Sequence, residues 1–279
     1  MVADALESWL RDYRGAHPQT ETAWIFLRSE PRRAALGAFE VLRQQWLDAV
    51  YAIREPRVAA TKLQWWVEEL QHAGNGQARH PLTQALLADE RVRAIPQAHW
   101  QEALLAAFRE LEAAPASDFA AQLAQAASLH GALARIETAV WFGAAGDPRR
   151  MQALAPVQHL AAMLRNLPME VDRGCTPLPM SLLARHDLSQ DDLLQDGPSR
   201  RAALRDQIRD VLQAMTEADK MPGPLSLFRG LQQRLDRHAL RRAMRAREPL
   251  RELQRRPGGF GALIDAWSAA RACRSAMRP

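Results

Sequence analysis

The arrangement of apolar and polar residues along the chain is that of α-helices. Ala, Leu, Arg, Gln and Glu, all strong helix formers, supply most of the residues. The strict alternation rich in Val, Ile and Thr that is typical of strands is hard to find anywhere. The pattern predicts an all-α protein, with helix boundaries good to about 2–4 residues. The expected helices cover residues 3–14, 31–53, 56–73, 81–89, 96–112, 116–144, 148–167, 199–218, 224–246 and 259–275.

Short breaker segments separate these stretches, among them HAGNG, AAGDP, MPGP and RRPGG. No repeat of fixed period interrupts the pattern, and no linker is long or low in complexity. The 279 residues are 47% apolar, which is enough for a substantial core. We therefore expect a single helical domain over residues 1–279.

Several features bear on the compartment. The mean hydropathy is −0.33, and no uninterrupted apolar run approaches the length that spans a bilayer. The first residues, MVADALESWLRDYRG, carry acids among the apolar positions, unlike a signal peptide. Cys175 and Cys273 do not have the spacing of metal ligands, and the eight histidines are scattered, so reduced thiols and no zinc site are expected. We expect a cytoplasmic protein.

The net charge of +5 comes almost entirely from arginine, since Lys62 and Lys220 are the only lysines. The most basic segment is 224–256, with nine arginines from Arg234 to Arg256. One interpretation is a solvated face with scattered ion pairs, for example between Asp236 and neighbouring arginines. The other is peripheral contact with lipid headgroups. No aromatic residues interleave for base stacking and no helix-turn-helix follows, so no nucleic-acid partner is expected.

Adjacent tryptophans, Trp65 and Trp66, lie within the predicted helix 56–73. Adjacent helical residues point about 100° apart, so the two rings cannot share one face. We expect one ring in the core and the other against a neighbouring helix or a cavity wall.

Three stretches together resemble the squalene/phytoene synthase family of head-to-head prenyl transferases. The first is PRRAALGAFEVLRQQWLDAVYAIREPRVAATKLQWWVEEL, similar to the family's long helix with the first aspartate-rich motif and its Leu-x-Trp-Trp helix. The second is GQARHPLTQAL, similar to the segment around His-Pro. The third runs from LRNLPMEVDRGCTPLP to SLLARHDLSQDDLL, similar to the second aspartate-rich motif, Arg-Gly, Leu-Pro, a helix and a turn.

The resemblance implies an isoprenoid-synthase-like helical bundle around a central cavity. In active members two Asp-x-x-x-Asp motifs face each other and bind magnesium, which holds the diphosphates of two prenyl substrates. Asp at i and i+4 places two carboxylates on one helical face. Magnesium prefers such oxygen ligands and bridges them to phosphate oxygens.

The second motif departs from this pattern. Its aspartates correspond to Asn166, which has no charge, and to Glu170 on the same face one turn later. Pro168 lies between them and should kink or end the helix.

The first motif departs further. With ALGAF as the anchor, its aspartates correspond to Gln44 and Asp48; with the Trp pair as the anchor, they correspond to Leu47 and Tyr51. Both registers remain open. In either case Asp48 is the only acid in 41–54, so this helix holds no pair of carboxylates at i and i+4.

At most two carboxylates, Asp48 and Glu170, remain as metal ligands should the protein be active, and we expect no cofactor otherwise. The remnant diphosphate site comprises Gln44, Asp48, Asn166, Glu170 and Arg173. Arg173 either contacts phosphate directly or pairs with a neighbouring acid, Asp172 or Glu170. The stretches LAAMLRNLPMEVDRGCTPLP and REPRVAATKLQWW resemble more closely a branch of the family with degraded motifs, which includes a mitochondrial respiratory complex I assembly factor.

The favoured hypothesis is therefore a pseudoenzyme that binds a prenyl diphosphate, another isoprenoid-type lipid or a protein partner. The alternative is an active, magnesium-dependent prenyltransferase of the phytoene or squalene synthase type, condensing two prenyl diphosphates. A third hypothesis, a basic helical protein acting on nucleic acid, rests on charge alone.

Overall fold

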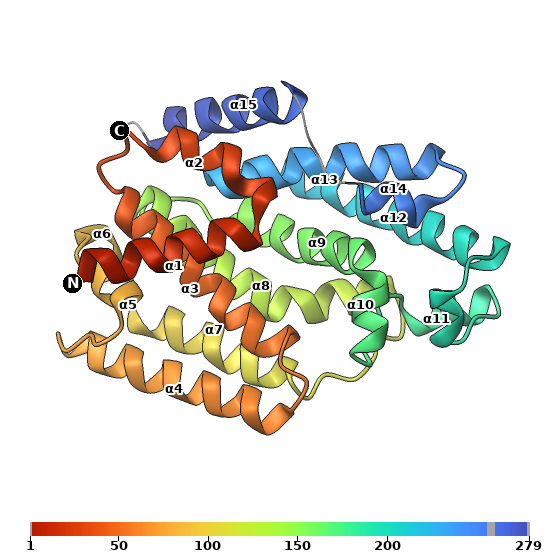
Figure 1. The fold of residues 1–279 in the computed structure, drawn as a ribbon, viewed down its shortest axis with the longest axis horizontal. Coiled ribbons are helices and arrows are strands. Elements are labelled where there is room, and N and C mark those ends of the chain that lie inside the picture. Colours follow the sequence, from red (N-terminus) through yellow and green to blue (C-terminus); the bar gives the residue numbers. More distant parts are fainter. Residues whose placement is uncertain (1, 256–259, 278–279) are drawn as a thin grey trace.

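The computed structural model describes residues 2–255 and 260–277, and the regular secondary structure of these residues is entirely helical (Figure 1). The all-α prediction is confirmed. The predicted start of the last helix at residue 259 lies outside the described residues. Each of the ten predicted stretches contains a helix: α1 (Val2–Ala16), α3 (Arg33–Tyr51), α4 (Pro56–Gly74), α5 (Pro81–Leu87), α7 (Gln97–Glu110), α8 (Phe119–Phe142), α9 (Arg149–Arg165), α12 (Pro198–Lys220), α13 (Leu227–Arg245) and α15 (Phe260–Met277).

Seven further elements are only three to seven residues long. They are η1 (Pro18–Thr20), α2 (Glu21–Leu27), α6 (Glu90–Arg93), α10 (Leu167–Asp172), α11 (Met180–Arg185), η2 (Asp191–Leu194) and α14 (Pro249–Leu253). A helix of one or two turns shows too little periodicity to be recognised in the sequence. Such helices are not stable alone and form because they pack against the longer ones.

The long helices surround α8 and α9, which pack against each other at the centre (Figure 1). On one side α7 packs on α8, and α4 packs on α7; on the other side α12 and α13 pack on α9. The last helix, α15, packs on α2 and α13 at the edge opposite α4. None of the described helices has the length and apolar character needed to cross a membrane.

The core contains large aromatic side chains that fix the position of α3. Trp46 on α3 and Trp141 on α8 are completely buried. The ring of Trp46 meets the ring of Trp100 on α7 edge-on, with 6.3 Å between centroids. Edge-to-face pairs of this kind contribute about 0.5–1.5 kcal/mol beyond the burial of their surface. The pair of Trp46 and Trp100 thus holds α3 against α7.

The chain breaks its helix at Asn166, as Pro168 predicts. α9 ends at Arg165 and α10 begins at Leu167, while Asn166 between them has φ −95° and ψ 15°. Pro168 is then the second residue of α10, where a backbone N–H has no helical acceptor to lose. Because of this break Asn166 is exposed and Glu170 is buried. The expectation that the two share one helical face is therefore wrong.

Candidate functional site

The α3 positions of the first motif do not present free carboxylates. The side-chain amide of Gln44 donates a hydrogen bond to Asp48 Oδ1 at 2.8 Å, one turn along the same helix. Leu47 packs against the apolar core. Tyr51 is the residue of this set that reaches α9. The structure thus brings the tyrosine of the Trp-anchored register, rather than Asp48, into contact with the helix of the second motif.

Tyr51 belongs to a stack of three rings from three helices. Its hydroxyl lies 3.2 Å from Nε2 of His130 on α8. Its ring stacks on His159 of α9, with 4.7 Å between centroids, and the two histidine rings stack at 4.1 Å. The three rings thus join α3, α8 and α9. Sequence reasoning missed both histidines, because each is a lone residue on its helix with no motif around it.

The environment keeps these rings neutral at physiological pH. Burial raises the pKa of Tyr51 well above its ordinary value, and the nearby carboxyl of Glu110 adds to this effect. Burial lowers the pKa of His159 to about 4. Burial, and then the neighbouring His159, lower the pKa of His130 well below its ordinary value. The stack is a set of uncharged groups and provides hydrogen-bonding atoms but no anionic ligand.

Glu170 lies close to this stack and is the buried acid of the second motif. Its carboxylate Oε1 is 3.8 Å from Nη1 of Arg173. Burial raises the pKa of Glu170, against the opposing influence of Arg173 and of the Cys175 thiol. Of the two arrangements predicted for Arg173, the geometry shows pairing with Glu170. Arg173, the residue that follows α10, is therefore paired with Glu170 of that helix.

These residues do not fit the magnesium sites that the family resemblance implies. Magnesium in such sites needs several ionised oxygens that converge on each ion. Here Asp48 is bonded to Gln44, Asn166 is exposed, and burial disfavours the ionised form of Glu170. Within residues 2–255 and 260–277, no group of three or more His, Cys, Asp or Glu is arranged to hold a metal ion.

A second buried network lies further along α8. Glu137 forms an ion pair with Arg229 of α13, and Arg229 Nη1 donates to Gln158 of α9 at 2.8 Å. Ser226, the N-cap of α13, also donates to Glu137. Burial acts to raise the pKa of Glu137, but Arg229 and Arg43 outweigh it and the pKa is lowered. Buried charged and polar groups thus tie α8, α9 and α13 together.

Asp236 on α13 is another buried acid, and its partner differs from the expectation. It pairs with Arg165 at the end of α9, and Gln232 donates to it at 2.7 Å. It does not pair with the neighbouring arginines of its own segment. The reason is its position on the buried side of α13, facing α9 rather than solvent.

The His-Pro segment has a structural role at the end of α4. One carboxylate oxygen of Glu69 accepts backbone hydrogen bonds from Arg79 at 2.9 Å and from His80 at 2.8 Å. Nδ1 of His80 accepts from Leu82 N at 3.2 Å and so caps α5. Pro81 then begins that helix, where a proline is favoured.

The ring of His80 forms the floor of an apolar groove on α4. It contacts three tryptophan rings, with centroid distances of 5.1 Å to Trp66, 5.2 Å to Trp9 and 5.6 Å to Trp65. As expected, Trp66 is buried and Trp65 is 45% exposed. The groove has a volume of about 560 Å³. We call this region the tryptophan groove; it is lined by Trp9, Gln45, Arg57, Val58, Thr61, Lys62, Trp65, Trp66 and His80.

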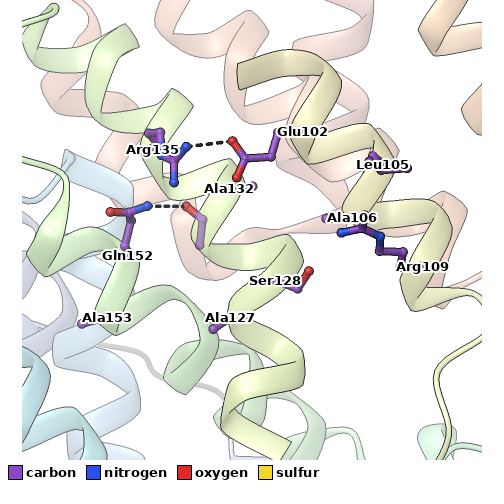
Figure 2. Close-up of a pocket in the computed structure, with 11 residues that line it drawn as sticks. Glu102, Leu105, Ala106, Arg109, Ala127, Ser128, Ala132, Arg135, Gln152 and Ala153 are labelled. Atoms are coloured by element: carbon purple, nitrogen blue, oxygen red, sulfur yellow. Dashed lines mark hydrogen bonds and ion pairs between the residues drawn. The ribbon is translucent and has the colours of Figure 1, made fainter. Parts of the chain in front are cut away.

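A second pocket, of about 490 Å³, lies between α7, α8 and α9 (Figure 2). His130 is not among the residues that line it, and small side chains such as Ala132 form much of its wall. Arg135 Nη1 donates to Glu102 across it at 2.7 Å, and Gln152 donates to the carbonyl of Gly131 at 3.4 Å (Figure 2). Four of its polar lining residues or backbone groups are thus paired with each other, those of Glu102, Gly131, Arg135 and Gln152.

Comparison with known proteins agrees with the fold and with the family resemblance. The family model for squalene/phytoene synthase matches residues 19–271, so the chain belongs to the squalene/phytoene synthase family. A crystal structure of a dehydrosqualene synthase in complex with ligand is similar with a TM-score of 0.74 and 10% identity, over 99% of this chain and 100% of that one. The structure of squalene synthase HpnC from Alicyclobacillus acidocaldarius is similar with a TM-score of 0.63 and 13% identity, over 98% and 95%. No curated protein matches the sequence significantly.

Proposed function

We propose that this chain uses the squalene/phytoene synthase fold as a non-catalytic, single-domain binding scaffold for an isoprenoid-type lipid. The observation that carries the proposal is the contact between α3 and α9. There Tyr51 stacks on His159, next to two carboxyl groups, Glu110 and Glu170, whose pKa values are raised by burial. Breaking the C–O bond of a prenyl diphosphate adds a negative charge to the departing diphosphate, which already carries several, and metal ions held by several carboxylates normally stabilise this charge. The residues present leave that charge unneutralised.

The tryptophan groove supports the binding half of the proposal. Its volume falls in the range of small-molecule sites, which are mostly apolar with a few polar groups that orient the ligand. Trp65 and Val58 offer exposed apolar surface to a branched hydrocarbon chain. Arg57 and Lys62 lie in the same lining, and Lys62 Nζ is 3.2 Å from Gln45 Oε1. These cations suit an isoprenoid that ends in an anionic headgroup.

The proposed absence of catalysis is tested by measuring pyrophosphate release. The purified protein is incubated with magnesium and with farnesyl or geranylgeranyl diphosphate, and an active dehydrosqualene synthase serves as the positive control. We expect no release above the rate without protein. Robust release that Asp48→Ala or Glu170→Ala abolishes would instead establish the prenyltransferase alternative.

The binding half is tested by calorimetric titration with farnesyl diphosphate and with farnesol, each with and without magnesium. We expect farnesyl diphosphate to bind equally in both conditions, because no metal bridge is needed. Trp65→Ala should weaken binding about tenfold through lost apolar contact, whereas Leu105→Ser on α7 should not. Weakening by Arg173→Ala rather than Trp65→Ala would move the site to the remnant motif. Absence of binding at millimolar ligand would refute a lipid ligand and leave a protein partner.

A further inference from the structure

The last helix, α15, carries apolar residues on two opposite faces. One face is buried against α2 and α13 and consists of small residues such as Ala266, Ala269, Ala270 and Cys273. The other face is solvent-exposed and carries Phe260, Leu263, Ile264 and Trp267, with Phe260 77% and Trp267 52% exposed. The spacing of three, one and three residues places these four side chains within one stripe of the helix. An ordinary surface helix has polar residues at such positions.

The same stripe becomes basic in the second half of α15. Arg271 follows Trp267 by one turn, and its guanidinium lies over the Trp267 ring at 5.7 Å from the centroid. Arg274 follows at the next position of the stripe and donates to the carbonyl of Phe26 on α2 at 3.0 Å. The only acid in the sequence of α15, Asp265, is turned inward, where it lies 3.2 Å from Nδ1 of His238.

A row of arginines on α13 borders α15. Gly230, Arg234 and His238 are four residues apart and share one face of α13. Both ends of this row contact α15: a Cβ on Gly230 would lie 3.5 Å from that of Ala269, and His238 contacts Asp265. Arg241 and Arg245 continue the exposed row.

These arginines have no competing acids nearby on their own helix. Arg234, Arg241 and Arg245 form no ion pair with any residue that the structure describes. The only acid in the sequence of α13 is Asp236, which is buried against Arg165. The exposed side of α13 therefore remains positively charged beside the apolar stripe of α15.

We infer that the exposed faces of α15 and α13 form a docking surface for an anionic lipid bilayer. Aromatic and aliphatic residues at the spacing found on α15 enter the boundary between headgroups and acyl chains. Arginines beside them attract anionic headgroups, with about 1 kcal/mol for each residue near the surface. The positive charge favours an anionic bilayer over a second copy of this chain, because a second copy would bring the same arginines against each other. This surface is separate from the tryptophan groove, and its test needs no isoprenoid.

The test is co-sedimentation of the full-length protein with vesicles. One set contains phosphatidylcholine alone, and the other contains phosphatidylcholine and phosphatidylglycerol in equal parts. We expect binding to the second set only, and weakening as salt is raised. The variant Ile264→Ser/Trp267→Ser should bind at least about tenfold more weakly, and Arg241→Ala or Arg271→Ala about fivefold more weakly each.

Matched substitutions on the opposite side of the molecule serve as controls. Leu105 on α7 is 51% exposed, like Trp267, and Arg54 is an exposed arginine before α4. Leu105→Ser and Arg54→Ala should bind like the wild type. The proposal would be refuted if Ile264→Ser/Trp267→Ser bound anionic vesicles as well as the wild type does. It would also be refuted if the wild-type protein did not bind anionic vesicles. A dimer in size-exclusion chromatography that Ile264→Ser/Trp267→Ser dissociates would assign the surface to a second copy and overturn the proposal as well.

Discussion

The ring of Tyr51 stacks on the ring of His159 with 4.7 Å between centroids and 26° between planes. This contact joins α3 to α9 at the level where the family's two motifs are expected to face each other. It is a contact between neutral rings, because burial raises the pKa of Tyr51 and lowers that of His159. The stability of this part of the molecule should therefore depend on the protonation of the histidines rather than on divalent cations.

Stability should fall as the pH falls from neutrality. The pKa of His159 is about 4 in the folded protein, against about 6.5 in an unfolded chain. The unfolded state therefore binds more protons, and stability is lost between about pH 6.5 and pH 4, by on the order of 2–3 kcal/mol from this residue. Urea unfolding followed across this range should show the decline, and His159→Gln should make it less steep, with His130 accounting for part of what remains. If the free energy of unfolding depended on pH equally in the variant and in the wild type, His159 would not be a source of the pH dependence.

The ion pair between Glu137 and Arg229 should be costly to break. Glu137→Gln leaves the Arg229 guanidinium buried without a counter-charge, which typically costs about 3–5 kcal/mol. The exposed pair of Arg14 and Glu21 provides the control, and Glu21→Gln should cost less than about 1 kcal/mol. Both values can be measured by urea unfolding at neutral pH. Similar losses for the two variants would mean that solvent reaches the Glu137 network.

The sequence alone was sufficient to predict the long helices. It also showed which aspartates of the family's motifs are replaced by other residues. The helix break at Asn166 was also predictable, because proline has a fixed local effect. The sequence could not show the stack of rings that lies between the helices carrying the two motif regions. Tyr51, His130 and His159 lie on three helices, and only the packing of those helices brings the rings together. The same holds for Asp236, whose partner Arg165 is distant along the chain.

Removing the charge of Glu170 should not destabilise the protein at neutral pH. Burial raises the pKa of Glu170, so the ionised form is disfavoured in the folded state. The contribution of this group to stability is greatest below its unfolded pKa and declines as the pH rises through the folded pKa. Glu170→Gln keeps the shape of the side chain, and we expect no loss or a gain of less than about 1 kcal/mol at pH 7. A loss above about 2 kcal/mol would show that the contact with Arg173 outweighs burial.

The connection between α12 and α13 should tolerate only glycine at position 223. Gly223 has φ +121°, and a Cβ there would lie 2.4 Å from the carbonyl oxygen of Asp147 in the α8–α9 connection. The neighbouring hydrogen bond from Arg150 N to Pro222 O, at 3.1 Å, holds the two connections together, so the clash is not easily relieved.

We therefore expect Gly223→Ala to lower the free energy of unfolding by about 3 kcal/mol or more, from backbone strain and overlap together. Gly76 is the matched control, with φ +74° but no atom within 4 Å of the added Cβ. Gly76→Ala should cost only the strain of the left-handed conformation, about 1–2 kcal/mol. Thermal and urea unfolding of the two variants should separate the contributions. If both variants lose the same stability, the close approach of Gly223 to Asp147 contributes nothing, and backbone conformation alone explains the glycine.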